Sequence, residues 1–172
     1  PDALTLQEAL LRDNPWWKAP HKVPGPYLDY EPRPFIESVY AQVTQRRFRR
    51  APVLMGPRRV GKTVMLYHSI ARLIADGFDP SRIAYVSLDM PVYRGVWLQR
   101  LVDAISLACG SKLNDGKPAW VFFDEIQYLK DWEVHLKTLV DQNPVLKFVA
   151  SGSAGAALAF DTLYAEGQRR YV

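Results

Sequence analysis

The pattern of hydrophobic and polar residues changes after residue 52. Beyond it, short apolar segments alternate with segments that carry apolar residues every three or four positions. The short segments predict strands, and the 3.6-residue spacing predicts amphipathic helices. Strands are expected at 53–55, 83–88, 120–123 and 146–150, and helices from near 62 to a stop at 76–77, at 97–107 and at 131–141. This alternation is typical of a parallel sheet covered by helices on both faces, so the predicted fold class is α/β.

Residues 1–34 do not follow this alternation. A short amphipathic stretch, Leu4 to Leu11, precedes five prolines that lie within residues 20–34. Proline fixes φ and removes a backbone donor, which excludes helix interiors and central strands there. We therefore predict an extended, proline-rich N-terminal arm over 1–34 and a core domain over 35–172. The side chains expected to anchor the arm are Trp16, Trp17, Tyr27 and Tyr30.

The composition excludes some classes of protein but does not indicate a particular function. The chain has 172 residues, enough for one domain, and a single cysteine, which excludes an internal disulfide framework and favours a cytoplasmic location. No apolar run is long enough for a membrane span, so no membrane partner is expected. The net charge of +4 allows a nucleic-acid partner but does not require one. A helical pattern that starts at Phe35 ends in the basic run Arg46–Arg50. These arginines could contact nucleic-acid phosphates. Alternatively, they are basic residues at a helix C-terminus, where the helix dipole favours positive charge.

The strongest chemical signal is a phosphate-binding loop between the first strand and the helix that follows it. The segment from Gly56 to Thr63 matches G-x-x-x-x-G-K-[ST] at every fixed position. Glycines let successive backbone N–H groups face phosphate oxygens, and the helix N-terminus adds its positive dipole end. Lys62 is expected to reach the β- and γ-phosphates, and the Thr63 hydroxyl to bind Mg²⁺. The predicted nucleotide-binding residues are Gly56, Pro57, Arg58, Arg59, Val60, Gly61, Lys62, Thr63 and Val64.

Acidic and hydroxyl side chains follow two later strands. Asp124 and Glu125 end the apolar strand at 120–123, and Ser151 follows the strand at 146–150. The carboxyl ends of parallel strands form the ligand-binding crevice of such sheets. Asp124 is therefore predicted to contact Mg²⁺, and Glu125 to hold the attacking water as general base. Ser151 is predicted to sense the γ-phosphate or the water, although serine is also a common turn residue.

Together, the loop at 56–63, the run 121–127 and Ser151-Gly152-Ser153 resemble the AAA+ superfamily. The chain is similar in particular to prokaryotic AAA+ ATP-binding proteins that carry a nuclease-like domain after the ATPase. Asn14-Pro15-Trp16-Trp17 and the strand end at Leu88-Asp89 also resemble that group, although Met90 stands where the family usually has a second acid. The resemblance implies a three-layer αβα fold with strand order 5-1-4-3-2. It also implies a homo-oligomer in which an arginine completes the neighbour's site, a role that falls on Arg169 or, as the weaker choice, Arg170.

Four strands are expected where the resemblance implies five. The fifth strand, the helical lid and any further domain are not visible in the sequence, so the chain is expected to be a fragment. Two functions remain open. The first is a Mg²⁺-dependent ATPase that drives conformational change in a larger, DNA-directed protein. The second is a nucleotide-gated interaction module with little or no turnover. ATP is the expected nucleotide because no guanine-reading motif is present.

Overall fold

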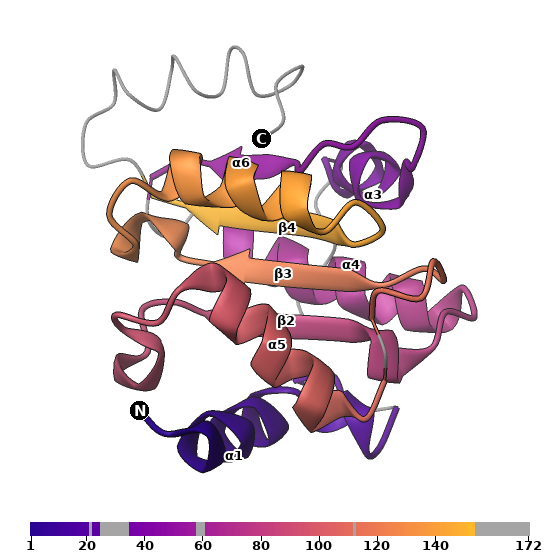
Figure 1. Cartoon of the computed structure of the whole chain (residues 1–172). Helices are drawn as coiled ribbons and strands as arrows, with labels where there is room; N and C mark the ends of the chain where they lie inside the picture. The colour runs from indigo at the N-terminus through magenta and orange to yellow at the C-terminus, as the bar shows by residue number, and fades with distance from the viewer. Residues whose placement is uncertain (21, 25–34, 58–60, 112, 154–172) are drawn as a thin grey trace.

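The computed structural model describes residues 1–20, 22–24, 35–57, 61–111 and 113–153. Its centre is a parallel four-stranded sheet in the order β1-β4-β3-β2, built from β1 (Val53–Met55), β2 (Ile83–Ser87), β3 (Trp120–Asp124) and β4 (Lys147–Gly152) (Figure 1). The register pairs Val53 with Ala150 and Ser87 with Asp124. This order confirms the predicted α/β class and its 1-4-3-2 arrangement. The fifth strand of the predicted order has no counterpart among the described residues.

Helices cover both faces of the sheet. Helices α5 (Leu98–Cys109) and α6 (Trp132–Gln142) lie on one face, and α3 (Ile36–Thr44) and α4 (Lys62–Ala75) lie on the other (Figure 1). Every residue of β3 is buried, because this strand is covered on both faces and flanked by β2 and β4. The structure is therefore a three-layer αβα sandwich.

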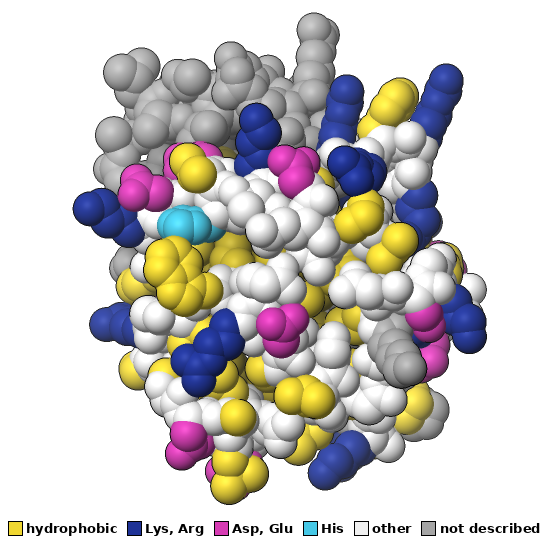
Figure 2. Space-filling view, viewed as in Figure 1, with side chains coloured by type: hydrophobic (Ala, Val, Ile, Leu, Met, Phe, Trp, Pro, Cys, Tyr) yellow, Lys and Arg dark blue, Asp and Glu magenta, His cyan; other side chains and the backbone are white. Residues whose placement is uncertain are grey.

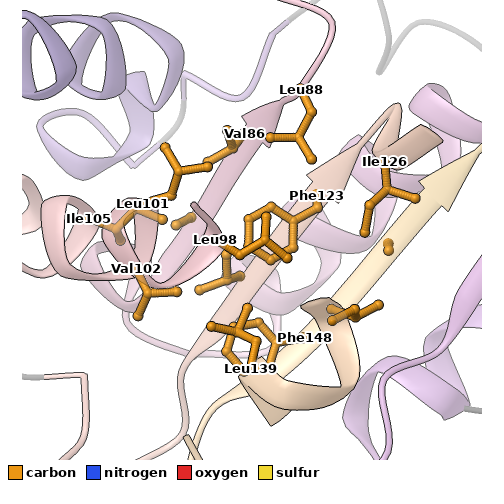
Figure 3. Packing of buried hydrophobic residues seen from close by; sticks show 14 of the residues in the cluster. Val86, Leu88, Leu98, Leu101, Val102, Ile105, Phe123, Ile126, Leu139 and Phe148 are labelled. Atoms are coloured by element: carbon orange, nitrogen blue, oxygen red, sulfur yellow. The ribbon is translucent and has the colours of Figure 1, made fainter. Parts of the chain in front are cut away.

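The core on the α5–α6 side is built from alternating strand residues and one stripe of each helix. Phe123 and Phe148 come from neighbouring strands and stack at a ring-centroid distance of 6.1 Å. Figure 3 shows Leu101 and Ile105 of α5 and Leu139 of α6 turned toward these strands. This packing fixes the strand that ends in Asp124.

The N-terminal segment packs against the edge strand β2. Helix α1 (Ala3–Asp13) lies against α5 because Leu6, Ala9 and Leu10 share one buried face. The prediction of an extended arm is therefore wrong for this stretch, where apolar spacing outweighs the influence of the prolines that follow. A short 3-10 helix, η1 (Pro15–Trp17), comes next, with Trp16 fully buried. Tyr27 and Tyr30 lie outside the described residues, and the domain boundary at residue 34 stays a prediction.

A buried lysine at the start of β4 makes stability depend on pH. Lys147 is 5% exposed, and its ammonium group donates to the carbonyl of Gln45 at 3.0 Å. Burial, with a smaller contribution from Arg46, lowers the pKa of Lys147 from 10.5 to about 8. Between these two values the unfolded chain binds more protons than the folded chain, so this group makes stability rise with pH across that interval.

We expect Lys147→Met to gain stability relative to the parent protein at pH 7 and to lose that advantage as the pH rises to 10.5. Between these pH values, the difference in unfolding free energy between variant and parent changes by at most about 3 kcal/mol, because each pKa unit corresponds to about 1.4 kcal/mol. Urea unfolding of both proteins across this pH range measures it. Lys137→Met, at an exposed lysine of α6, is the control. A difference that stays constant with pH would contradict this explanation.

Candidate nucleotide site

The phosphate-binding loop joins β1 to α4 at the carboxyl edge of the sheet. Gly56 is tied to the neighbouring strand, because its N–H donates to the carbonyl of Gly152 at 3.2 Å. Gly61 caps α4 with φ 87° and ψ 21°, a left-handed conformation that favours glycine. The first turn of α4, whose N–H groups have no partner within the helix, presents these groups and its positive dipole end to the loop. Val64 lies in this first turn, whereas Arg58, Arg59 and Val60 lie outside the described residues.

Lys62 lies inside the loop. Its side chain is 7% exposed, and its ammonium group donates to the carbonyl oxygens of Gly56 at 2.9 Å and Pro57 at 2.6 Å. Burial lowers the pKa of Lys62, and the nearby charges of Glu125 and Asp124 act in the opposite direction. A buried ammonium group held by two neutral carbonyls can form much stronger interactions with an anion.

Asp124 is the centre of the polar network. Its carboxylate is 1% exposed and accepts four hydrogen bonds. One oxygen, Oδ2, accepts from the Thr63 hydroxyl at 2.8 Å and from the Tyr85 hydroxyl at 2.5 Å. The other oxygen, Oδ1, accepts from the Ser151 hydroxyl and from the N–H of Glu125 at 3.1 Å. A buried carboxylate needs such donors, because an unpaired buried charge is strongly destabilising.

The structure brings together most of the residues predicted from sequence. Thr63, Asp124 and Ser151 are linked through the Asp124 carboxylate, and Lys62 lies one residue before Thr63. Ser151 is fully buried and also accepts from the N–H of Glu125 at 3.3 Å. Ser151 therefore contacts the predicted metal-binding carboxylate directly.

Glu125 has an unusual backbone conformation. Its φ of 57° and ψ of 46° are left-handed values that non-glycine residues rarely adopt. Gln127 donates a hydrogen bond to the Glu125 carboxylate and accepts another from the N–H of Ser153 at 3.0 Å. Strained residues of this kind cluster at functional sites, where neighbouring contacts hold them in place.

Close packing around Gly152 explains the glycine between the two serines. A side-chain carbon added there would lie 2.9 Å from Met55 Sδ and 3.2 Å from Ile126 Cγ2. Glycine therefore lets Met55 of β1 and Ile126, after β3, pack closely on the backbone of β4.

Two residues of the site were missed from the sequence. Tyr85 of β2 donates to Asp124, and burial, followed by the charge of Asp124, raises the pKa of the Tyr85 hydroxyl well above its usual value. Gln127 pairs with Glu125. The predicted strand order, which places β2 beside β3, is the one signal that could have led to Tyr85, because a buried tyrosine hydroxyl needs a hydrogen-bond partner.

The residues present suit Mg²⁺ bound together with phosphate. Mg²⁺ is usually bound by one or two protein oxygens plus phosphates and water. Thr63 Oγ1 and Asp124 Oδ2 lie 2.8 Å apart at the first turn of α4, which makes them suitable protein oxygens. The described residues contain no group of three His, Cys, Asp or Glu side chains that would hold a metal without the nucleotide.

A cleft opens beside this network. It has a volume of about 410 Å³ and extends from Thr63, Asp124 and Glu125 to Arg12 and Asp13 at the end of α1. Thr63, Asp124 and Glu125 therefore border solvent on the side of the N-terminal segment.

The remaining candidate residues lie elsewhere. The exposed run Arg46–Arg50 follows α3 near the start of β4, at the opposite edge of the sheet from Asp124. Arg169 and Arg170 lie outside the described residues. Among the described helices, none has the length and apolar character needed to cross a membrane.

Comparison with known proteins agrees with this geometry. A family model described as an AAA domain matches residues 48–169, which include the phosphate loop, Asp124, Glu125 and Ser151. The chain is 34% identical over 109 residues to the uncharacterized protein MJ1637 of Methanocaldococcus jannaschii, and this match covers 62% of the chain and 22% of that protein. It is 57% identical over 49 residues to the UvrABC system protein A of Clostridium tetani, covering 26% of the chain and 5% of that protein.

The chain thus spans only a small part of either relative's length. The family match covers most of the chain itself, and the fold and the strand–loop–helix site fit it. The sequence resemblance to AAA+ ATPases is confirmed at this level, and the chain belongs to the AAA domain family.

Proposed function

We propose that the chain is the nucleotide-binding part of a Mg²⁺-dependent ATPase. The observation that carries the proposal is the direct link between Thr63, at the end of the phosphate loop, and the buried Asp124. Lys62 and Glu125 flank this pair on either side. In this arrangement the loop and Lys62 bind the phosphates, and Thr63 and Asp124 hold Mg²⁺.

Hydrolysis in this proposal is an in-line attack of water on the γ-phosphorus. The new P–O bond forms as the bond to the β–γ bridging oxygen breaks, which gives ADP and inorganic phosphate. Glu125 orients the water and accepts its proton. Bound Mg²⁺ supplies charge neutralisation for the phosphate oxygens. Lys62 supplies a second positive charge, and Ser151 fixes the orientation of Asp124.

The resemblance to AAA+ ATPases adds three features to the proposal. The protein forms a homo-oligomer in which Arg169 or Arg170 reaches the neighbour's site. It is located in the cytoplasm, and the chain acts within a longer, DNA-directed protein. The large unmatched portions of both relatives support a longer protein. A nuclease-like domain after the ATPase belongs to the same proposal.

Release of phosphate from ATP tests the proposal, with Mg²⁺ present and with Mg²⁺ removed by EDTA. We expect release that requires Mg²⁺ and is faster with ATP than with GTP. Stoichiometric Mg²⁺-ATP binding without release would favour the nucleotide-gated interaction module instead. Failure to bind any nucleotide would overturn both functions.

We also propose that the basic run Arg46–Arg50 contacts nucleic-acid phosphates. Phe48 is 50% exposed and lies beneath the guanidinium groups of Arg47, at 5.4 Å, and Arg50, at 4.8 Å. Dark-blue basic side chains project around a hydrophobic side chain above the loop that follows α3 (Figure 2). Exposed arginines and an exposed ring suit a phosphate backbone and its bases.

We expect the double variant Arg47→Gln/Arg49→Gln to bind duplex DNA more weakly at low salt and to bind ATP normally. Two fewer phosphate contacts should reduce the slope of log K against log salt by about 2. Fluorescence anisotropy at several salt concentrations measures the slope. Lys18→Gln/Lys22→Gln removes equal charge from exposed positions of the N-terminal segment and should leave the slope unchanged. Equal slopes for the parent protein and the arginine variant would contradict the proposed phosphate contacts of Arg46–Arg50.

A further inference from the structure

Tyr85 links the Asp124 carboxylate to the N-terminal segment. Its side chain is 5% exposed, and its hydroxyl donates to the same oxygen, Asp124 Oδ2, that accepts from Thr63. The other three donors to Asp124 come from the phosphate-loop helix, the β4 strand and the backbone of Glu125. Tyr85 is therefore the one donor among the described residues that comes from β2.

The backbone of Tyr85 is held by a single amide side chain. Asn14 Oδ1 accepts from the N–H of Tyr85 at 2.6 Å, and Asn14 Nδ2 donates to the carbonyl of Tyr85 at 3.0 Å. Because β2 is the edge strand of the described sheet, these backbone groups point away from β3 and need another partner. The Asn14 side chain replaces the missing neighbouring strand at this residue.

The two tryptophans that follow continue this edge contact. The indole N–H groups of Trp16 and Trp17 both donate to the carbonyl of Ile83, at 2.8 Å and 2.7 Å. Ile83 is two residues before Tyr85, so its carbonyl points to the same outer edge. The segment Asn14–Trp17 therefore covers the outer edge of β2 at Ile83 and Tyr85.

The ring of Tyr85 is held from the other side. Tyr67 packs against it at a ring-centroid distance of 4.6 Å, and Trp16 meets Tyr67 edge-on at 6.4 Å. Tyr67 lies one helical turn after Thr63 on α4. Asn14 thus holds the backbone of the residue that donates to Asp124, and Trp16 packs on Tyr67, the side chain that contacts the ring of that residue.

We propose that Tyr85 is a positioning residue that orients the Asp124 carboxylate for Mg²⁺, and that Asn14 directly, and Trp16 through Tyr67, hold Tyr85 in place. This inference rests on the proposed nucleotide function and adds the N-terminal segment to its site. Hydrogen bonds to a metal-binding carboxylate fix its rotation, and losing one typically weakens metal affinity or activity about 10- to 100-fold. Tyr85 touches neither phosphate nor water in this proposal and acts through Asp124.

Tyr85→Phe removes only the hydroxyl and keeps the packed ring. We expect the Mg²⁺ concentration needed for half-maximal tightening of binding of a fluorescent ATP analogue to rise about 10- to 100-fold. Affinity for the analogue in EDTA should stay within twofold of the parent protein. Tyr40→Phe is the matched control, because the buried Tyr40 hydroxyl donates to Asp76 at 2.6 Å, away from the site.

A double-mutant cycle tests the part played by Asn14. Asn14→Ala should shift the Mg²⁺ dependence in the same direction as Tyr85→Phe, and the double variant should shift it no further, since Asn14 acts through Tyr85. Fully additive shifts would overturn the role of Asn14. An unchanged Mg²⁺ dependence in Tyr85→Phe, or an equal shift in Tyr40→Phe, would overturn the role of Tyr85.

These measurements use binding, so they separate this inference from hydrolysis. A parent protein that binds Mg²⁺-ATP without turnover would end the ATPase proposal, and the Tyr85→Phe comparison would still decide the positioning role. A parent protein whose ATP binding does not depend on Mg²⁺ would overturn the positioning role, whatever its turnover.

Discussion

Lys62→Met is expected to weaken ATP binding about 30-fold to a few thousand-fold. Lys62 is a buried ammonium group held by the neutral carbonyls of Gly56 and Pro57. Removing one member of a buried charge pair costs about 2–5 kcal/mol, and each 1.4 kcal/mol is a factor of ten in affinity. Methionine keeps the length of the side chain, so the change removes mainly the charge. Isothermal titration of ATP in the presence of Mg²⁺ measures the loss.

Lys130→Met is the control for this variant, because Lys130 is exposed and lies outside the loop. Its affinity for ATP should match that of the parent protein. Thermal unfolding without nucleotide should show Lys62→Met to be folded. If the folded Lys62→Met variant bound ATP as tightly as the parent protein, the assignment of the phosphate site would be wrong.

Glu125→Gln is expected to lower turnover about 100- to 10,000-fold and to leave ATP binding within a few fold. This range is the usual contribution of a general base to the rate. Glutamine keeps the shape of Glu125 and its contact with Gln127, but it cannot accept the proton of the attacking water. Steady-state phosphate release with Mg²⁺-ATP measures the rate, and titration of ATP measures binding in the same preparation.

Glu133→Gln serves as the matched control, since Glu133 is an exposed acid in the first turn of α6. It should release phosphate at the parent rate. Equal turnover in Glu125→Gln and the parent protein would remove Glu125 from the mechanism, and another group would then have to activate the water.

Much of the fold was predictable because its signals are local. The apolar run at 120–123 predicted a buried strand, and β3 is buried along its whole length. The loop sequence predicted a strand–turn–helix unit, and Gly61 takes the left-handed conformation that this turn requires. The strand order came from the resemblance to AAA+ ATPases, because register between distant strands has no local signature.

The polar network of the site was only partly predictable. Thr63, Asp124 and Ser151 were each indicated by their place after a strand or loop, and they meet in the structure. Tyr85 and Asn14 were not, since their roles depend on contacts between β2, β3 and the N-terminal segment. The amphipathic spacing of Leu4 to Leu11 was visible in the sequence, but the packing on α5 that stabilises the helix Ala3–Asp13 was not.

The most direct test of the proposed hydrolysis is a single-turnover reaction with the protein in excess over ATP and with Mg²⁺ present. We predict that the parent protein converts the bound ATP to ADP and phosphate, whereas Glu125→Gln binds the ATP and leaves it intact. ATP that stays intact and bound on both proteins would contradict hydrolysis, and ATP that binds neither would contradict the nucleotide site itself.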